Sequence, residues 1–141
     1  MKVAVARTPE ARAACFDVRA AVFIVEQGVP ASEEWDGLDE VCTHFLAGEA
    51  DAPAGCARLA SNGEAAKVQR VAVMPSHRGT GLGARLMRAS LDHARRAGFR
   101  VVVLDSQVQA IGFYEKLGFR AHGPEFLDAG IPHRAMSLSV S

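Results

Sequence analysis

Residues 69–87 read Gln-Arg-Val-Ala-Val-Met-Pro-Ser-His-Arg-Gly-Thr-Gly-Leu-Gly-Ala-Arg-Leu-Met and contain the most informative junction of the chain. A β-branched run ends at Pro75, a short polar turn follows, and a glycine-rich sequence then opens a long amphipathic segment. The change from strand-like to helical spacing predicts a strand and a turn, followed by a helix over residues 81–97.

Gly79, Gly81 and Gly83 alternate where this helix should begin. The first turn of a helix carries backbone N–H groups without an intrahelical partner, and its dipole favours a negative charge. Because glycine has no Cβ, phosphate oxygens can approach such a backbone closely. Together with the cation of Arg78, this pattern predicts a site for a phosphate or a diphosphate.

Two familiar phosphate-binding motifs can be compared with this segment. A P-loop requires Lys and then Ser or Thr directly after its last glycine, but Ala84 and Arg85 follow Gly83. A dinucleotide-binding loop requires an acidic residue about twenty positions further on, and Asp105 lies near that spacing. The P-loop is therefore excluded, whereas the dinucleotide interpretation stays open.

A third interpretation fits more of the chain. The run from Arg78 to Gly83 resembles the acyl-CoA pyrophosphate loop of the GNAT superfamily of N-acyltransferases. The preceding residues 71–75 resemble its fourth strand, and residues 110–119, Ala-Ile-Gly-Phe-Tyr-Glu-Lys-Leu-Gly-Phe, resemble its C-terminal motif. Residues 18–30 with Glu34, Asp36, Asp39 and His44, and the turn at 128–133, are similar to the ElaA-type branch.

The resemblance implies a fold and one GNAT domain over residues 1–141. It implies a mixed α/β sheet of about six or seven mostly antiparallel strands, splayed at one parallel pair and covered by helices on both faces. The spacing of apolar residues agrees. The spacing of apolar residues predicts strands at 2–6, 43–48, 55–60, 68–73, 101–104 and 136–140, and further helices at 9–25 and 108–117.

Two of the predicted strands carry further signals. Val68, Val71 and Val73 are out of phase for a strict alternation, and a β-bulge near residues 69–71 would restore the phase. Residues 101–104 form an uninterrupted apolar run, which predicts a strand covered on both faces. Because a helix precedes this strand, it should lie parallel to the strand before that helix.

Charge and cysteine content limit the partners. The 16 basic and 16 acidic residues cancel, which argues against a nucleic-acid partner. Residues 1–66 carry five Lys/Arg and eleven Asp/Glu, and residues 67–141 carry eleven and five. The basic C-terminal half suits a polyanionic cofactor such as CoA, and the acidic N-terminal half suits a cationic acceptor such as an amine. The alternative is that the surface charge is uneven by chance. The sequence carries no signal for oligomeric state, so a homodimer remains open.

We expect a cytoplasmic protein without a membrane partner, because no apolar run is long enough to span a bilayer and the first residues do not form a signal peptide. Three cysteines, an odd number without a Cys-x-x-Cys pair, fit a reducing compartment. Cys42, His44 and Cys56 match no zinc spacing. We therefore expect core cysteines and no metal.

The resemblance assigns the cofactor acetyl-CoA to defined positions. The backbone of the bulged strand would hold the pantetheine arm, the glycine-rich loop would hold the pyrophosphate, and Gln107 stands where the family commonly has a pantetheine-contacting Asn. The implied cofactor-binding residues are Val71, Ala72, Val73, Arg78, Gly79, Thr80, Gly81, Leu82, Gly83 and Gln107.

Tyr114 matches the position of the family's general acid, which protonates the departing thiolate. The base that deprotonates the amine is left open among Glu26, Glu34, Asp36, His44 and His133, and of these we put Glu26 and His44 first. We expect Glu34, Asp36 and His133 to face the acceptor, a small-molecule, peptide or protein amine. Because the cysteines lack a His-Asp context, a covalent acyl-enzyme is disfavoured.

Two functions from different classes follow. The first is an acetyltransferase that moves an acetyl group from acetyl-CoA to a primary amine by direct attack in a ternary complex. The second is a catalytically silent module that senses acyl-CoA. Both predict CoA binding, and only the first predicts release of free thiol.

Overall fold

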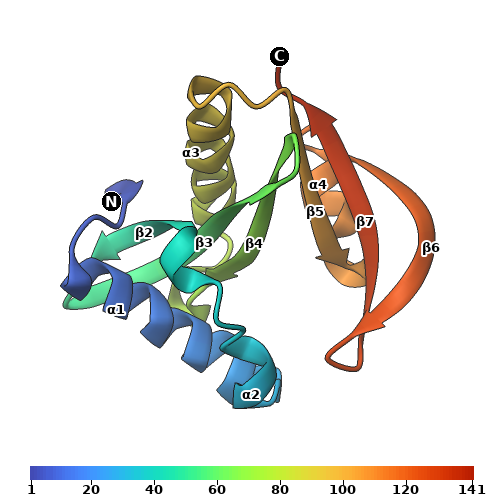
Figure 1. Cartoon of the computed structure of the whole chain (residues 1–141). Coiled ribbons are helices and arrows are strands. Elements are labelled where there is room, and N and C mark those ends of the chain that lie inside the picture. The colour runs from blue at the N-terminus through green and yellow to red at the C-terminus, as the bar shows by residue number, and fades with distance from the viewer.

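The computed structural model describes all residues, 1–141, and shows a central sheet with helices on both faces (Figure 1). The strands are β1 (Val3–Val5), β2 (Thr43–Glu49), β3 (Ala52–Asn62), β4 (Ala65–Val73), β5 (Val101–Gln107), β6 (Arg120–Asp128) and β7 (Ile131–Ser139). The α-helices are α1 (Pro9–Arg19), α2 (Ala31–Glu34), α3 (Leu82–Arg96) and α4 (Ile111–Glu115). A π-helix, η1 (Ala20–Glu26), and three short 3₁₀ turns, η2 (Asp39–Val41), η3 (Pro75–His77) and η4 (Val108–Ala110), complete the elements.

The sheet has seven strands in the order β1-β2-β3-β4-β5-β7-β6. Every neighbouring pair is antiparallel except β4 and β5, which are parallel and joined by α3. The two parallel strands pair only at Ala66 with Val102 and at Lys67 with Val103. Beyond that point they diverge, as Figure 1 shows. The predicted mixed sheet with one splayed parallel pair is confirmed, and this topology rules out a doubly wound dinucleotide-binding fold.

The two faces of the sheet bury different helices because side chains alternate along each strand. Phe45 of β2 packs in one cluster with Leu86 of α3, whereas the next residue, Leu46, packs in a second cluster with Val18 of α1. Residues of α4 pack against the first cluster, so α3 and α4 cover the same face. The larger core therefore lies beneath α3, close to the point where the parallel strands separate.

The β-bulge predicted near residues 69–71 is present. Gln69 pairs with Arg58, and Ala72 pairs with Cys56, so β4 has one residue more than β3 between these pairs. Arg70 takes the extra position with a φ of 57°, in the left-handed region that non-glycine residues seldom adopt. The bulge places this unusual residue where β4 begins to leave β5.

Three local features differ from the sequence-based expectations. The helix predicted over residues 9–25 changes at Ala20 into the π-helix η1, and the acidic loop after it contains α2 and η2. The edge strand β6 was not predicted, because nearly all of its residues are exposed and no buried alternation marks it. The prediction that 101–104 is covered on both faces is wrong, since Val102 and Leu104 are buried while Val101 is 39% exposed. None of the helices has both the length and the apolar character needed to cross a bilayer.

Candidate functional site

A cleft opens where β4 and β5 separate, and it holds a cavity of about 360 Å³. The side chain of Lys67 on β4 forms an ion pair of 3.0 Å with Asp105 on β5 near the point of separation. Other walls come from the end of η1, from α4 and from the β6–β7 hairpin. The cleft therefore joins segments that lie far apart in the sequence.

The β4 wall of the cleft has an open backbone edge. No residue of β4 after Lys67 pairs with β5, although the opposite edge continues to pair with β3 as far as Val73. Val71, Ala72 and Val73 all line the cavity. An unpaired strand edge of this kind can accept an extended ligand as an additional strand.

The glycine loop, residues 78–84, connects this edge to α3. Gly79 and Gly81 have φ values of 78° and 82°, and Gly81 caps the helix. The Thr80 hydroxyl donates a 2.6 Å hydrogen bond to the carbonyl oxygen of His77, which holds the turn. None of the backbone N–H groups of residues 79–84 donates a hydrogen bond within the protein. This run of free donors at the positive end of a helix fits a phosphate group.

Arg78, the cation of the loop, already has a partner at the end of η1. Its Nη atoms donate to the two carboxylate oxygens of Glu26 at 2.7 and 2.6 Å, and its Nε donates to the carbonyl oxygen of Val73 at 3.0 Å. The hydrogen bonds from Arg78 lower the pKa of Glu26. Glu26 is therefore a charged partner of Arg78 and a weaker proton acceptor than a free glutamate.

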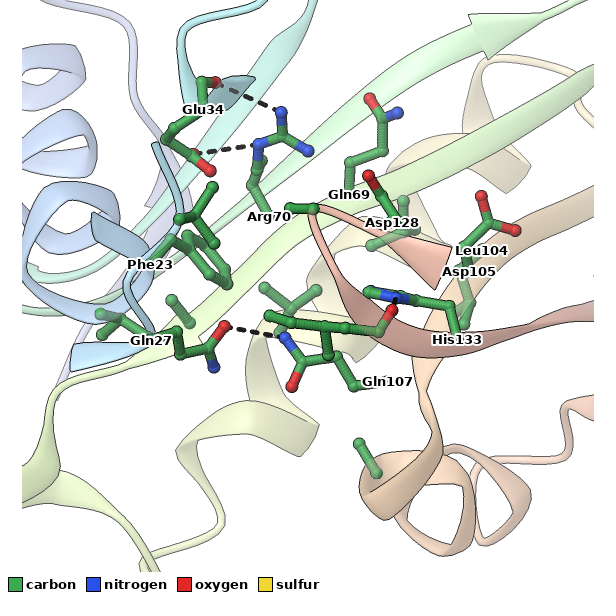
Figure 2. Close-up of a pocket in the computed structure, with 18 of the residues that line it drawn as sticks. Phe23, Gln27, Glu34, Gln69, Arg70, Leu104, Asp105, Gln107, Asp128 and His133 are labelled. Atoms are coloured by element: carbon green, nitrogen blue, oxygen red, sulfur yellow. Dashed lines mark hydrogen bonds and ion pairs between the residues drawn. The ribbon is translucent and has the colours of Figure 1, made fainter. Parts of the chain in front are cut away.

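A second side-chain contact spans the cleft one residue further along. The Gln107 amide nitrogen donates a 2.9 Å hydrogen bond to Oε1 of Gln27, as Figure 2 shows. Oε1 of Gln107 accepts a hydrogen bond from Gln109. Glu26, the last residue of η1, and Gln27, which follows it, thus each contact a predicted cofactor-binding residue.

Tyr114 lies in α4 and lines the cavity. Its ring makes edge contacts with Phe113 and Phe119, and its hydroxyl forms no hydrogen bond with the protein. Burial raises the pKa of Tyr114 to about 12. The hydroxyl is therefore protonated throughout the neutral range and has no protein acceptor.

Comparison with known proteins assigns this architecture to a family. A family model described as an acetyltransferase (GNAT) domain matches residues 11–140. The chain belongs to the GNAT acetyltransferase family. It is 39% identical over 137 residues to the uncharacterized N-acetyltransferase YjcF of Bacillus subtilis. The alignment covers 96% of this chain and 98% of the relative.

Solved structures of the family agree with this assignment. An acyl-CoA N-acyltransferase from Pseudomonas aeruginosa has a TM-score of 0.85 and 30% identity over 96% of each chain. Escherichia coli ElaA has a TM-score of 0.84 and 25% identity over 96% of this chain and 97% of its own. The predicted resemblance to the ElaA-type branch is confirmed, and the chain is an acyltransferase of the GNAT type.

Most of the residues that the sequence proposed for the GNAT site lie together around the cleft. Arg78, Gln107 and Tyr114 line one cavity with the 71–73 segment, and so do Glu26, Glu34 and His133. The remaining glycine-loop residues continue directly from Arg78 into α3. Residues 79–83 do not line the cavity themselves, and neither do the proposed His44 and Asp36.

His44 lies on β2 and packs against α1. It is 3% exposed, its Nε2 lies 2.8 Å from the carbonyl oxygen of Asp39, and its ring contacts Phe16 edge-on. Because a carbonyl oxygen only accepts, Nε2 must donate the hydrogen bond. Burial lowers the pKa of His44. Its position supports a structural role rather than proton transfer in the cleft.

The acidic loop forms an ion network instead of a free acidic surface. Glu34, only 3% exposed, accepts from Arg19 at 2.8 Å and from Arg70 at 3.0 Å. Arg58, fully buried, binds Asp36 at 2.8 Å. Asp39 completes the ion network with Arg19 at 2.6 Å and Arg58 at 3.0 Å. The carboxylates of Glu34 and Asp36 are thus occupied by arginines of the protein itself.

Two residues that sequence reasoning did not propose contribute to the cleft. Arg70 lines the cavity and joins the bulge to Glu34, as Figure 2 shows. The phase slip of β4 located the bulge but gave no sign of this ion pair. Gln27 owes its position to the π-helical end of η1, for which the sequence offers no recognisable signal.

Proposed function

We propose that this GNAT protein transfers an acetyl group from acetyl-CoA to a primary amine by direct attack within a ternary complex. The observation that carries the proposal is the run of unpartnered N–H groups at residues 79–84, which continues into the open edge of β4. One feature suits a diphosphate and the other an extended pantetheine arm. The catalytic domain would comprise residues 1–141.

Acetyl-CoA would bind along this path. The N–H groups of Gly79, Thr80, Gly81, Leu82 and Gly83 would bind the pyrophosphate oxygens. The backbone of Val71, Ala72 and Val73 would pair with the pantetheine arm, and a strand N–H would polarise the thioester carbonyl. Arg78 would exchange the Glu26 carboxylate for phosphate, and Gln107 would exchange Gln27 for an amide of the arm.

Tyr114 would act as the general acid. The neutral amine attacks the thioester carbon, a C–N bond forms, and the C–S bond breaks as the tetrahedral intermediate collapses. The thiolate takes the hydroxyl proton of Tyr114, and the tyrosinate then takes a proton from the new amide nitrogen. A hydroxyl with a pKa near 12 retains its proton until the thiolate appears beside it.

The cysteines support direct attack rather than a covalent acyl-enzyme. Cys15 and Cys56 are buried, and neither lines the cavity. Burial raises the pKa of the Cys15 thiol to about 11 and that of Cys56 in the same direction. Neither thiol is therefore available as a thiolate nucleophile near neutral pH.

Release of free CoA thiol from acetyl-CoA, measured with a panel of small-molecule, peptide and protein amines, tests the proposal. We expect at least one amine to support release, and Tyr114→Phe to lower kcat by about tenfold or more. Both proteins should show the same thermal shift with CoA, which verifies folding and binding. If CoA stabilises the wild type while no amine releases thiol, the protein is an acyl-CoA sensor and the proposal is wrong.

A further inference from the structure

His133 has one ring nitrogen fixed by the backbone and the other one free. It lies on β7, is 9% exposed and lines the cavity (Figure 2). Its Nδ1 is 2.7 Å from the carbonyl oxygen of Ile131. Since a carbonyl oxygen cannot donate, Nδ1 must carry a proton in this hydrogen bond. The neutral ring therefore has its lone pair on Nε2.

Nε2 has no hydrogen-bond partner in the protein, yet it is not sealed off. Among buried side-chain polar atoms, only Nε of Arg58 is both enclosed and unpartnered, so Nε2 of His133 keeps access to solvent. The ring stacks on Phe126 with a centroid distance of 6.0 Å and an interplanar angle of 24°. The imidazole is thus held in one plane and one tautomer with a basic atom accessible.

We propose that His133 is the general base that takes a proton from the acceptor ammonium, an inference that rests on the proposed acetyl transfer. The other carboxylates and the second histidine considered for this role are already occupied. Glu26 is bound by Arg78, Glu34 by Arg19 and Arg70, and Asp36 by Arg58. His44 has its Nε2 bound and lies outside the cavity. Among these candidates, only His133 lines the cavity with a basic atom that has no hydrogen-bond or ion-pair partner in the protein.

The ionisable groups on neighbouring elements are compatible with this role. Asp105 on β5 is paired with Lys67, and Asp128 on β6 and Tyr114 in α4 line the same cavity. Arg134, next in sequence, donates its Nε to the carbonyl oxygen of Gly123 and does not line the cavity. The carboxylates that line the cavity favour a cationic amine there.

The proton balance uses both groups of the cleft. The ammonium loses one proton to Nε2 of His133, and the resulting neutral amine attacks the thioester. CoA leaves with the proton of Tyr114, which is restored from the amide nitrogen, and His133 returns its proton to solvent. The Nδ1–H bond to Ile131 is the same in the neutral and the protonated ring, so the imidazole does not need to reorient.

The test is the pH dependence of kcat/KM for the best amine of the panel. His133→Asn retains a side-chain N–H close to the position of Nδ1 and removes the basic atom. We expect kcat/KM at pH 7 to fall by about 100-fold or more. It should recover toward the wild-type value as the pH approaches the pKa of the free amine, about 10 for an alkylamine, while the thermal shift with CoA stays unchanged.

His122→Asn is the matched control, because His122 is an exposed histidine on β6 outside the cavity and should keep the wild-type profile. His133→Gln provides a second variant if His133→Asn does not fold. Nitrogen NMR of the wild type should show neutral His133 protonated on Nδ1, and protonation on Nε2 would overturn the proposal. A wild-type rate and acidic limb in His133→Asn or His133→Gln would also overturn it while leaving acetyl transfer intact. If wild type releases no thiol with any amine, both proposals are wrong.

Discussion

Two polar regions flank the cleft, and they treat their hydrogen-bonding groups in opposite ways. The glycine loop leaves the N–H groups of residues 79–84 without protein partners. The ion network, made of Arg19, Arg58, Arg70, Glu34, Asp36 and Asp39, pairs each of its charges with an opposite one. The first region has donors left for a ligand, whereas the second has used its charges to fix the structure.

This difference shows that a charged side chain is not necessarily available to bind a ligand. An acidic run in the sequence indicates a cationic ligand only if its carboxylates remain free after folding. Here Arg58 holds Asp36 with two hydrogen bonds, from Nη1 at 2.9 Å and from Nη2 at 2.8 Å, and these lower the pKa of Asp36. The ion network therefore anchors the α2–η2 segment against the bulge of β4, and the donors left free for a ligand lie in the glycine loop.

The largest effect should come from breaking the ion network at its buried centre. Arg58→Met removes a fully buried cation and leaves Asp36 and Asp39 without it. Removing one partner of a buried ion pair costs about 3–5 kcal/mol, and we expect a loss of that order in the free energy of unfolding from urea titration. Arg88→Met is the control, because Arg88 is exposed and unpaired; it should change stability by less than about 0.5 kcal/mol.

The same variant has a pH signature. Hydrogen bonds from Arg58 lower the pKa of Asp36, and for Asp39 those from Arg19 and Arg58 outweigh the opposing effect of burial. A lowered pKa stabilises the fold above the unfolded-state pKa, about 3.9 for aspartate, and this stability is lost as the pH falls below it. The wild type should thus lose stability between pH 5 and pH 3, and Arg58→Met should lose less. Equal pH slopes would show that Arg58 does not stabilise the fold through the charges of Asp36 and Asp39.

The sequence predicts the backbone of this site better than its ion pairs. Residues 69–87 predict the strand, the glycine loop and the helix, because periodicity, proline and glycine act on the chain locally. The bulge is also predictable, since it shifts the phase of the valines in β4. The edge strand β6 is not, because it buries little and its exposed residues lack alternation.

Side-chain partners depend on segments brought together only by folding. Glu34 and Arg70 are separated by 36 positions, and Glu26 and Arg78 by 52. Nothing local to Glu34 marks it as buried, so the sequence alone could not distinguish it from a substrate-binding carboxylate. The same limit applies to His44 and His133. Only the folded structure shows that the first ring is buried away from the cavity and that the second lines it.

An intermediate effect should follow from altering the glycine loop. Gly81→Ala places a Cβ on a residue with a φ of 82°, where an L-residue costs about 1–2 kcal/mol. The added atom meets no protein atom within 4 Å, so the expected effect on binding comes from the altered conformation of the loop that carries the free N–H groups. We expect the dissociation constant for CoA to rise by about tenfold, measured by calorimetry.

Gly98→Ala separates strain from ligand binding. Gly98 follows the other end of α3, has a φ of 94° and likewise has no atom within 4 Å of an added Cβ. This variant should lose a similar amount of stability and bind CoA like the wild type. Equal CoA affinities in the two alanine variants would contradict the diphosphate site at residues 79–84.

The smallest effect concerns Arg78, the one charged residue of the glycine loop, which is already paired with a carboxylate of the protein. Arg78 is bound by Glu26 in an exposed pair, with 43% and 42% of the two side chains accessible, so a ligand phosphate must displace the carboxylate. Glu26→Gln weakens that competitor, and the KM for acetyl-CoA should fall by less than about fivefold, because exposed pairs are weak. Asp92→Asn breaks a comparably exposed pair with Arg95 on α3, away from the cleft, and should leave KM unchanged. A higher KM in Glu26→Gln would mean that Glu26 orients Arg78 for the phosphate instead of competing with it, and the glycine loop would then depend on a protein partner as the ion network does.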